Sequence, residues 1–160
     1  MSRLSHLDKK GNAHMVNLSG KSVTYREAVA MGVVKMKKDT LTTIINEGVK
    51  KGDVLAVARV AGIMAAKKTP ELIPLCHPIF INSVNIEFNI DEKKSLIQVF
   101  STVSCEEKTG VDMEAMVSVS VACLTIYDMC KGIDKSIEIG EIKLLKKTGG
   151  KSGTFIREGL

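Results

Sequence analysis

The chain is poor in aromatic residues, with no tryptophan, two tyrosines and four phenylalanines among its 160 residues. Proteins that bind single-stranded nucleic acid take much of their affinity from bases stacked on aromatic side chains. The net charge of +5 nevertheless favours an anionic partner. The composition therefore predicts a phosphorylated small molecule as the partner and argues against nucleic acid.

Cysteine and histidine are also scarce and widely spaced. The four cysteines form no C-x-x-C pair and the three histidines form no H-x-x-x-H pair. Disulfide frameworks and zinc sites both depend on such spacings. We expect reduced thiols, no bound metal and no cofactor.

Long apolar runs are absent, since no stretch approaches the roughly 20 apolar residues that span a bilayer. The first residues, MSRLSHLDKKGNAH, are polar and lack the apolar segment of a secretory signal. We expect one soluble domain over residues 1–160, cytoplasmic and without a membrane partner, with flexible ends at 1–12 and 149–160. A chain of this length can bury roughly two thirds of its unfolded surface in one core.

Hydrophobic periodicity divides the chain into strands and helices. It predicts strands over 22–36 and 136–147, a hairpin over 82–104, and helices over 41–48, 53–68 and 111–132. One further short strand is expected within residues 1–22. Helices that alternate with antiparallel strands indicate an α+β fold with the helices packed on one face of the sheet. The other face also carries apolar residues that need cover, so we expect oligomerisation.

Single residues refine these elements. Asp39 or Thr40 is expected to cap the N-terminus of the first helix, which should end at Gly48. Gly62 lies inside the second helix, where the missing side chain indicates that another element packs closely. The third helix carries small and apolar residues almost all round, so we expect it to be buried.

The third helix also carries charged residues, among them Glu114, Asp128 and Lys131. Asp128 and Lys131 are at i, i+3 and can form an ion pair, either as an ordinary surface pair or as part of a site. Glu114 and Asp128 lie ~21 Å apart along the helix axis, although within ~40° of the same face. If both carboxylates serve one small substrate, they must come from different subunits.

The stretch LIPLCHP, Leu72 to Pro78, places Cys76 and His77 between two prolines. Each proline fixes its own φ and biases the preceding residue toward extended geometry. The segment is either a rigid ledge that presents polar groups to a substrate or a stiff turn on the core. A Cys–His nucleophile pair is disfavoured because neighbours in an extended segment point to opposite sides.

Two basic segments are candidates for phosphate binding. Lys51 precedes an expected helix start, where N–H groups and the helix dipole attract anions, but it could equally be a solvated turn residue. The tail KKTGGKSG is not a P-loop, because Leu145 stands where that motif needs glycine and no helix follows. Lys147 and Lys151 could close over phosphates, or the segment could be a flexible end.

Several motifs follow one another along the chain: KGDV, AGIMAAK, LIPLCHP, KTGVDMEAM, LTIYDMCK and GGKSG. Over residues 5 to about 155 they resemble the bacterial cyclic pyranopterin monophosphate synthases, the accessory protein C family of molybdenum-cofactor biosynthesis. The resemblance implies a lyase that converts 3′,8-cyclo-7,8-dihydroguanosine 5′-triphosphate to cyclic pyranopterin monophosphate with release of diphosphate. It also implies a ferredoxin-like fold and a homohexamer, a trimer of dimers, with active sites at subunit interfaces.

Carried over by position, the resemblance implies three catalytic residues, Lys51, Asp128 and Lys131. The substrate-binding set, with Lys147 of the tail included, is Leu75, Cys76, His77, Met113, Glu114 and Lys147. Rebuilding the purine ring system moves protons, for which a carboxylate beside lysines is suited, and expelling diphosphate builds negative charge that cations stabilise. We expect Asp128 to shuttle protons, Lys131 to keep Asp128 ionised or to share that work, and Lys51 to act as an acid or a phosphate clamp.

Two positions depart from the family's usual TGKTGVEMEAL. Glu107 stands where the family has glycine, and Asp112 where it has glutamate. The loop before the long helix could therefore follow a different path, since glycine there could have held a φ that Glu107 disfavours.

Two alternatives come from other functional classes. One is a nucleotide- or pterin-binding module that has kept the pocket and lost turnover, against which the intact Lys51, Asp128 and Lys131 argue. The other is a basic nucleic-acid binder, against which the scarcity of aromatic residues argues.

Overall fold

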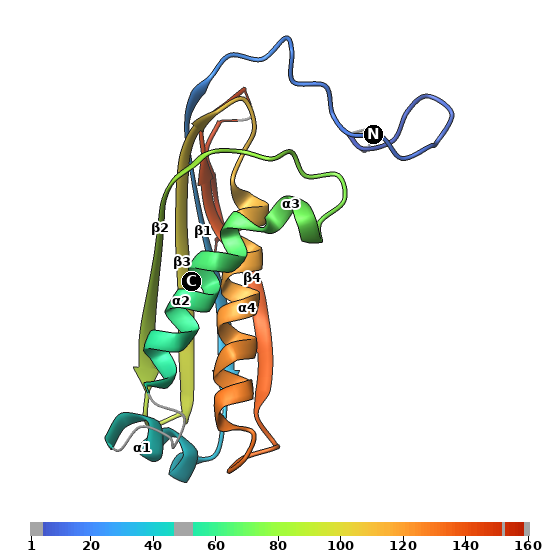
Figure 1. Cartoon of the computed structure of the whole chain (residues 1–160). Coiled ribbons are helices and arrows are strands. Elements are labelled where there is room, and N and C mark those ends of the chain that lie inside the picture. Colours follow the sequence, from blue (N-terminus) through green and yellow to red (C-terminus); the bar gives the residue numbers. More distant parts are fainter. Residues whose placement is uncertain (1–4, 47–52, 152, 159–160) are drawn as a thin grey trace.

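The computed structural model describes residues 5–46, 53–151 and 153–158. The strands are β1 (Thr24–Lys35), β2 (Ile81–Asp91), β3 (Leu96–Glu107), β4 (Glu138–Thr148) and β5 (Phe155–Ile156). The helices are α1 (Lys38–Asn46), α2 (Val54–Lys67), α3 (Thr69–Leu72) and α4 (Asp112–Cys130), all labelled in Figure 1.

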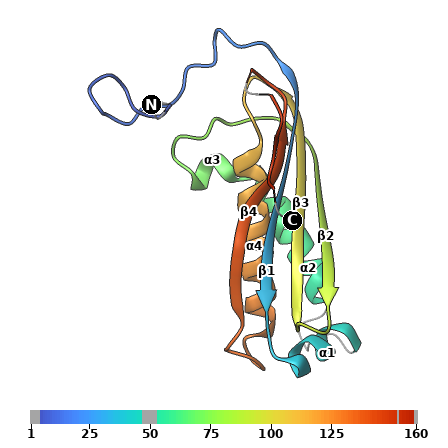
Figure 2. The ribbon, with the colours of Figure 1, turned by 180° about the vertical axis from the view of Figure 1, so that it is seen from behind.

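All five strands form one antiparallel sheet in the order β2-β3-β1-β4-β5. Helices α2 and α4 lie side by side on one face, while the view from behind shows the strands of the other face (Figures 1 and 2). The succession β1, α2, β2, β3, α4, β4 is the ferredoxin-like arrangement. The predicted α+β fold, with helices on one face of an antiparallel sheet, is confirmed.

Small residues in β1 bring α4 close to the middle of the sheet. Ala28 and Ala30 are fully buried on the helix side of this strand. A Cβ atom added at Gly32 would lie only 2.7 Å from the side chain of Val119 in α4. At Gly62 of α2, an added Cβ would lie 3.0 Å from the carbonyl oxygen of Ser118. The close packing expected at Gly62 is confirmed.

Helix α4 is the central core helix of the domain. By length and composition alone it could cross a membrane, and it is the one helix in the described part of the chain that could. Half of that apolar stretch is buried, and its contacts are with α2 and the sheet. Core helices of soluble proteins share these properties, so the composition of α4 follows from its contacts with the sheet and with α2.

A second, smaller apolar cluster lies on the sheet face opposite the helices. Its members are Val29, Met31, Val33, Leu96, Phe100 and Leu145. No helix of the described ranges covers this face (Figure 2). Four of the six, Met31, Val33, Leu96 and Leu145, are nevertheless buried within the chain itself, so this cluster is a small second core.

The predicted cap of the first helix was wrong. Helix α1 begins three residues earlier than the expected position 41, at Lys38, which puts Asp39 inside its first turn. Thr40 is buried and its hydroxyl donates a 3.1 Å hydrogen bond to Asp134, 94 residues away, so it does not cap the helix. The expected helix end at Gly48 lies outside the described residues.

The N-terminal arm extends away from the sheet and forms no strand over residues 5–22 (Figure 1). Its backbone makes one isolated bridge, between Leu7 and Ala13. Between them, the carboxylate of Asp8 accepts hydrogen bonds from the backbone N–H groups of Lys10 and Asn12 at 2.7 and 2.8 Å. Such local side-chain bonds compete with strand pairing, which explains why the expected short strand is replaced by a loop.

Candidate active site

A hollow of about 550 Å³ opens at the N-terminal end of α4. Its walls come from the N-terminal arm, the segment after α3, the start of α4, and the adjoining parts of β1 and β4. The hollow gathers every residue of the predicted substrate-binding set: Leu75, Cys76, His77, Met113, Glu114 and Lys147.

The LIPLCHP segment is anchored by the end of the helix before it. Thr69 is fully buried, and its hydroxyl donates to the carbonyl of Ala66 at 3.0 Å. Helix α3 then ends at Leu72, and the N–H of Cys76 donates to the carbonyl of Ile73 at 3.0 Å. The chain from Cys76 to Phe80 has no regular structure, and Leu75, Cys76 and His77 line the hollow.

Cys76 is half-buried beside two carboxyl groups. Burial raises the pKa of its thiol, and the negative charges of Glu114 and Asp112 raise that pKa further. The thiolate, not the thiol, is the nucleophile. The environment therefore keeps Cys76 neutral, which agrees with the prediction that it is not a Cys–His nucleophile.

Glu114 is the buried carboxyl group of the hollow, with only 3 % of its surface exposed. Burial raises its pKa from 4.5 to about 7, and the neighbouring Asp112 contributes in the same direction. A carboxyl group with such a pKa holds and releases a proton near neutral pH, which suits general acid–base chemistry.

Replacing Glu114 by glutamine is expected to stabilise the protein at alkaline pH and to change it little in acid. Above pH 7 the folded state buries a charge that the unfolded chain keeps in water. One pKa unit corresponds to about 1.4 kcal/mol, so a pKa raised from 4.5 to about 7 costs on the order of 3 kcal/mol. This cost shrinks as the pH falls and vanishes below about 4.5, the pKa of the unfolded chain.

Urea unfolding of the wild type and of Glu114→Gln at about pH 8 and about pH 5 measures this effect. The gain in unfolding free energy should be larger at the higher pH. An equal gain at both values would contradict a raised pKa.

Cations stand beside the acidic groups of the hollow. Lys147 lies opposite Ala28 of β1 in the register of the two strands. Because Ala28 faces the helices, the side chain of Lys147 also lies on the face that carries α4. Its Nζ lies 3.4 Å from a carboxylate oxygen of Asp112. Arg26 donates at 3.2 Å to the backbone carbonyls of Glu107 and Lys108, so it anchors the loop before α4.

Sequence reasoning did not assign five ionisable residues of this hollow to the site: His6, Lys21, Arg26, Glu27 and Asp112. The sequence does contain a pattern that points to Arg26. It occupies an even-numbered position of β1, on the same side as Ala28 and Ala30, and a charge on the buried side of a strand indicates a polar site.

The glycine-rich tail folds back onto this end of the sheet. Gly149 and Gly150 have positive φ values of 94° and 74°, which glycine adopts without strain. A Cβ added at Gly150 would collide with the guanidinium group of Arg26. Glu107 ends β3 and is not among the described non-glycine residues with positive φ, so the departure at this position introduces no backbone strain.

The two remaining charged residues of α4 lie at the opposite end of the helix. Lys131 Nζ is 2.6 Å from a carboxylate oxygen of Asp128, and about half of each side chain is exposed. The hydrogen bond and charge of Asp128 raise the pKa of Lys131. The hollow around Glu114 and the Asp128–Lys131 pair are therefore separate within one chain, by about 21 Å along the helix axis.

Lys51, the third predicted catalytic residue, lies outside the described residues. Within the described ranges no group of three or more His, Cys, Asp or Glu side chains could hold a metal ion. Burial raises the pKa values of Cys105 and Cys123 to about 11 and about 12, so both remain neutral thiols of the core.

Comparison with known proteins gives one consistent result. The model of the MoaC family matches residues 15–150. A protein of Pelotomaculum thermopropionicum named cyclic pyranopterin monophosphate synthase is 52 % identical over 159 residues, which cover 99 % of this chain and 94 % of that protein. Proteins of the same name from Heliobacterium modesticaldum and a Roseiflexus species are 54 % and 52 % identical over 158 residues, covering 99 % of this chain and 99 % and 100 % of the relatives.

Proposed function

The chain belongs to the MoaC family, and from this premise we infer that it is a cyclic pyranopterin monophosphate synthase, a lyase of molybdenum-cofactor biosynthesis. Its substrate is 3′,8-cyclo-7,8-dihydroguanosine 5′-triphosphate, and its products are cyclic pyranopterin monophosphate and diphosphate. The observation that carries the assignment is the hollow at the N-terminus of α4, which unites motif residues from three distant parts of the chain.

The hollow has the chemistry that binding of a triphosphate requires. Lys21, Arg26 and Lys147 supply positive charge, and the N-terminus of a 19-residue helix adds N–H groups and the positive end of its dipole. These fixed cations thus face the negative charge of the substrate's triphosphate. The ledge Leu75–His77 and Met113 lie within reach of the ring system of a substrate held there.

Proton transfer falls to the acidic groups of the site. Glu114, with a pKa of about 7, can give and take a proton at neutral pH without leaving its buried position. Asp128 is the second proton carrier, Lys131 shares its work, and Lys51 acts as an acid or as a clamp on the phosphates. Cations near the leaving oxygens stabilise the charge that builds as diphosphate departs.

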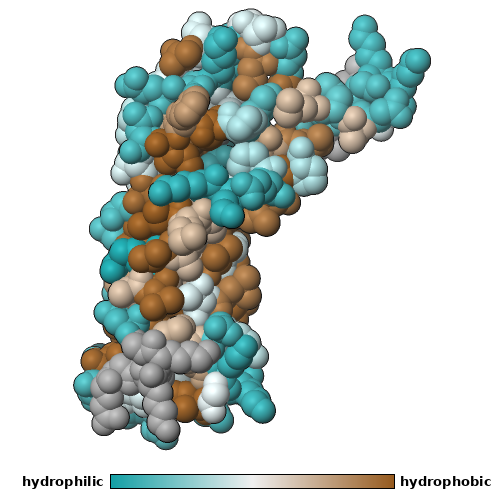
Figure 3. All heavy atoms as spheres, viewed as in Figure 1, coloured by the Kyte–Doolittle hydropathy of each residue, from teal (hydrophilic) through white to brown (hydrophobic). Residues whose placement is uncertain are grey.

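The active site is completed by a second copy of the chain. The Asp128–Lys131 pair cannot reach the hollow of its own subunit along one straight helix. An exposed apolar surface lies over α2 and α4 in Figure 3 and includes the side chains of Val57, Val60, Met64 and Leu124. This surface supports association of copies of the chain into a homohexamer, a trimer of dimers, with its active sites between subunits.

Incubation with the cyclo-dihydro-GTP substrate tests the proposed function. The expected result is the release of diphosphate and the appearance of a pterin that becomes fluorescent after oxidation. A protein that retains the substrate without releasing diphosphate would be a silent binding module, and the assignment as a synthase would be wrong.

A further inference from the structure

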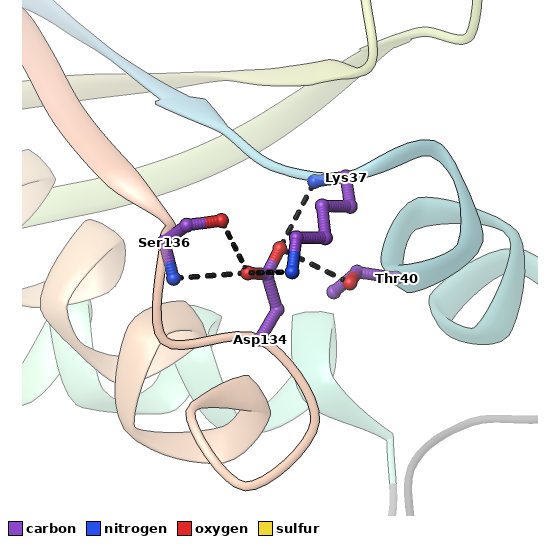
Figure 4. A network of polar contacts seen from close by, with 4 residues as sticks. All are labelled: Lys37, Thr40, Asp134 and Ser136. Atoms are coloured by element: carbon purple, nitrogen blue, oxygen red, sulfur yellow. Dashed lines mark hydrogen bonds and ion pairs between the residues drawn. The ribbon is translucent and has the colours of Figure 1, made fainter.

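Asp134 lies in the turn between α4 and β4 and is one of the few buried charged residues, with 1 % of its surface exposed. One of its carboxylate oxygens accepts from the N–H and the hydroxyl of Ser136, at 2.9 and 2.6 Å. The other oxygen accepts from the N–H of Lys37 at 2.9 Å and from the hydroxyl of Thr40 at 3.1 Å. Figure 4 shows these donors converging on the carboxylate from two separate segments of the chain.

The network stabilises the ionised form of this carboxyl group. The hydrogen bonds from the backbone of Lys37 and from Ser136 hold the pKa of Asp134 well below its usual range. The ammonium group of Lys37 adds an ion pair at 3.9 Å. A buried carboxylate with this many donors remains charged and rigidly oriented at every physiological pH.

Asp134 joins two parts of the chain that carry proposed catalytic residues. On one side, the backbone N–H groups of Ile133 and Asp134 both donate to the carbonyl of Cys130, so the backbone of Asp134 is tied directly to the last turn of α4. That turn carries Asp128 and Lys131. On the other side, Lys37 and Thr40 lie at the start of α1.

The last turn of a helix frays readily unless other contacts hold it. The Asp128–Lys131 pair is itself about half exposed. Asp134 connects this turn to the β1–α1 junction, because its backbone bonds Cys130 and its carboxylate bonds Lys37 and Thr40. A displacement of a catalytic group by about 1 Å can cost on the order of a hundredfold in rate.

We propose that Asp134 is a positioning residue of the active site, which holds the C-terminal turn of α4 against the β1–α1 junction and so fixes the Asp128–Lys131 pair for catalysis. The proposal rests on the proposed synthase function. It assigns Asp134 no contact with substrate. Its action is on turnover rather than on binding, because the hollow that holds the substrate lies at the other end of α4.

Four variants test the role. Asp134→Ala removes the acceptor, and Thr40→Val and Ser136→Ala each remove one donor while leaving the carboxylate in place. Asp91→Ala is the matched control, because Asp91 also caps a turn, accepts from the N–H of Lys94 at 3.0 Å and pairs with its ammonium group, but stands in the β2–β3 turn.

Turnover and substrate affinity of each assembled variant are measured together with hydrogen exchange of backbone amides. For Asp134→Ala we expect kcat to fall about 10- to 100-fold with KM within about threefold of the wild type. The donor variants should lose about two- to tenfold in kcat, and Asp91→Ala should match the wild type. Exchange should become faster over residues 128–134 and stay unchanged over residues 111–120.

The outcomes separate this role from a purely structural one. Faster exchange along the whole of α4, a loss of kcat that only follows the loss of folded protein, or a raised KM with unchanged kcat would overturn the proposal. If Asp134→Ala fails to fold, wild-type kcat in the folded variants Thr40→Val and Ser136→Ala would also overturn the proposal. A wild type that releases no diphosphate would instead overturn the synthase function.

Discussion

Replacing Asp128 by asparagine is expected to lower turnover by at least about 100-fold while the protein remains folded and assembled. General acid–base catalysis contributes about 10²- to 10⁴-fold to enzymatic rates, and an amide cannot take the proton that a carboxylate takes. More than half of the Asp128 side chain is exposed, so an isosteric change should cost little stability. Diphosphate release measures the activity, and circular dichroism with sedimentation checks the fold and the assembly.

A matched control for this variant is Glu71→Gln. Glu71 pairs with Lys68 at i, i+3, as Asp128 does with Lys131, and is likewise exposed. Glu71 lies in α3 and is not among the residues that line the hollow, so its replacement should leave turnover unchanged. Ordinary product formation by Asp128→Asn would refute a proton-transfer role for Asp128.

Mixed assemblies of two inactive variants are expected to recover activity. Glu114→Gln damages the hollow and Asp128→Asn damages the far end of α4, and in one chain these positions are about 21 Å apart along the helix. If each active site combines the hollow of one copy with the Asp128–Lys131 pair of another, some sites of a mixed assembly receive both intact halves. Random mixing in equal amounts leaves about a quarter of the sites with both halves intact. Each parent variant alone is expected to retain under about 1 % of the wild-type turnover.

The experiment requires coexpression of the two variants with different affinity tags and isolation of particles that carry both. Recovery of activity, from under about 1 % to about a quarter of the wild-type rate, would support an intersubunit site. A doubly tagged assembly as inactive as its parents would mean that each site lies within one subunit. The separation of Glu114 and Asp128 along α4 would then have no catalytic meaning.

The elements of the fold were predictable from the sequence because their apolar residues repeat locally. Alternation over β2 and β3 and the apolar character of α4 are properties of neighbouring residues. The two-residue strand β5 and the four-residue helix α3 were missed, since elements this short carry no detectable period. The backbone N–H and the guanidinium group of Arg157 each donate at 2.7 Å to carbonyls of β4, which hold β5 at the sheet edge.

The candidate site was predictable in part, through motifs. Leu75–His77, Met113, Glu114 and Lys147 were identified before the structure, and the hollow gathers all of them. Arg26 and Asp112 were not identified. Their part in the site depends on contacts with Glu107, Lys108 and Lys147 that no local pattern contains.

The sequence by itself determined the order of strands and helices, the absence of a disulfide or zinc pattern, and the family to which the chain belongs. These properties depend on residue type and local spacing, which are written along the chain. Only the tertiary structure decided that Thr40 binds Asp134 instead of capping a helix, that Glu114 is buried enough to hold a proton near neutral pH, and that Asp128 stands at the opposite end from the hollow. Each of these properties depends on the removal of a side chain from water or on contact between residues far apart in sequence. Both arise only when the sheet and the helices pack together.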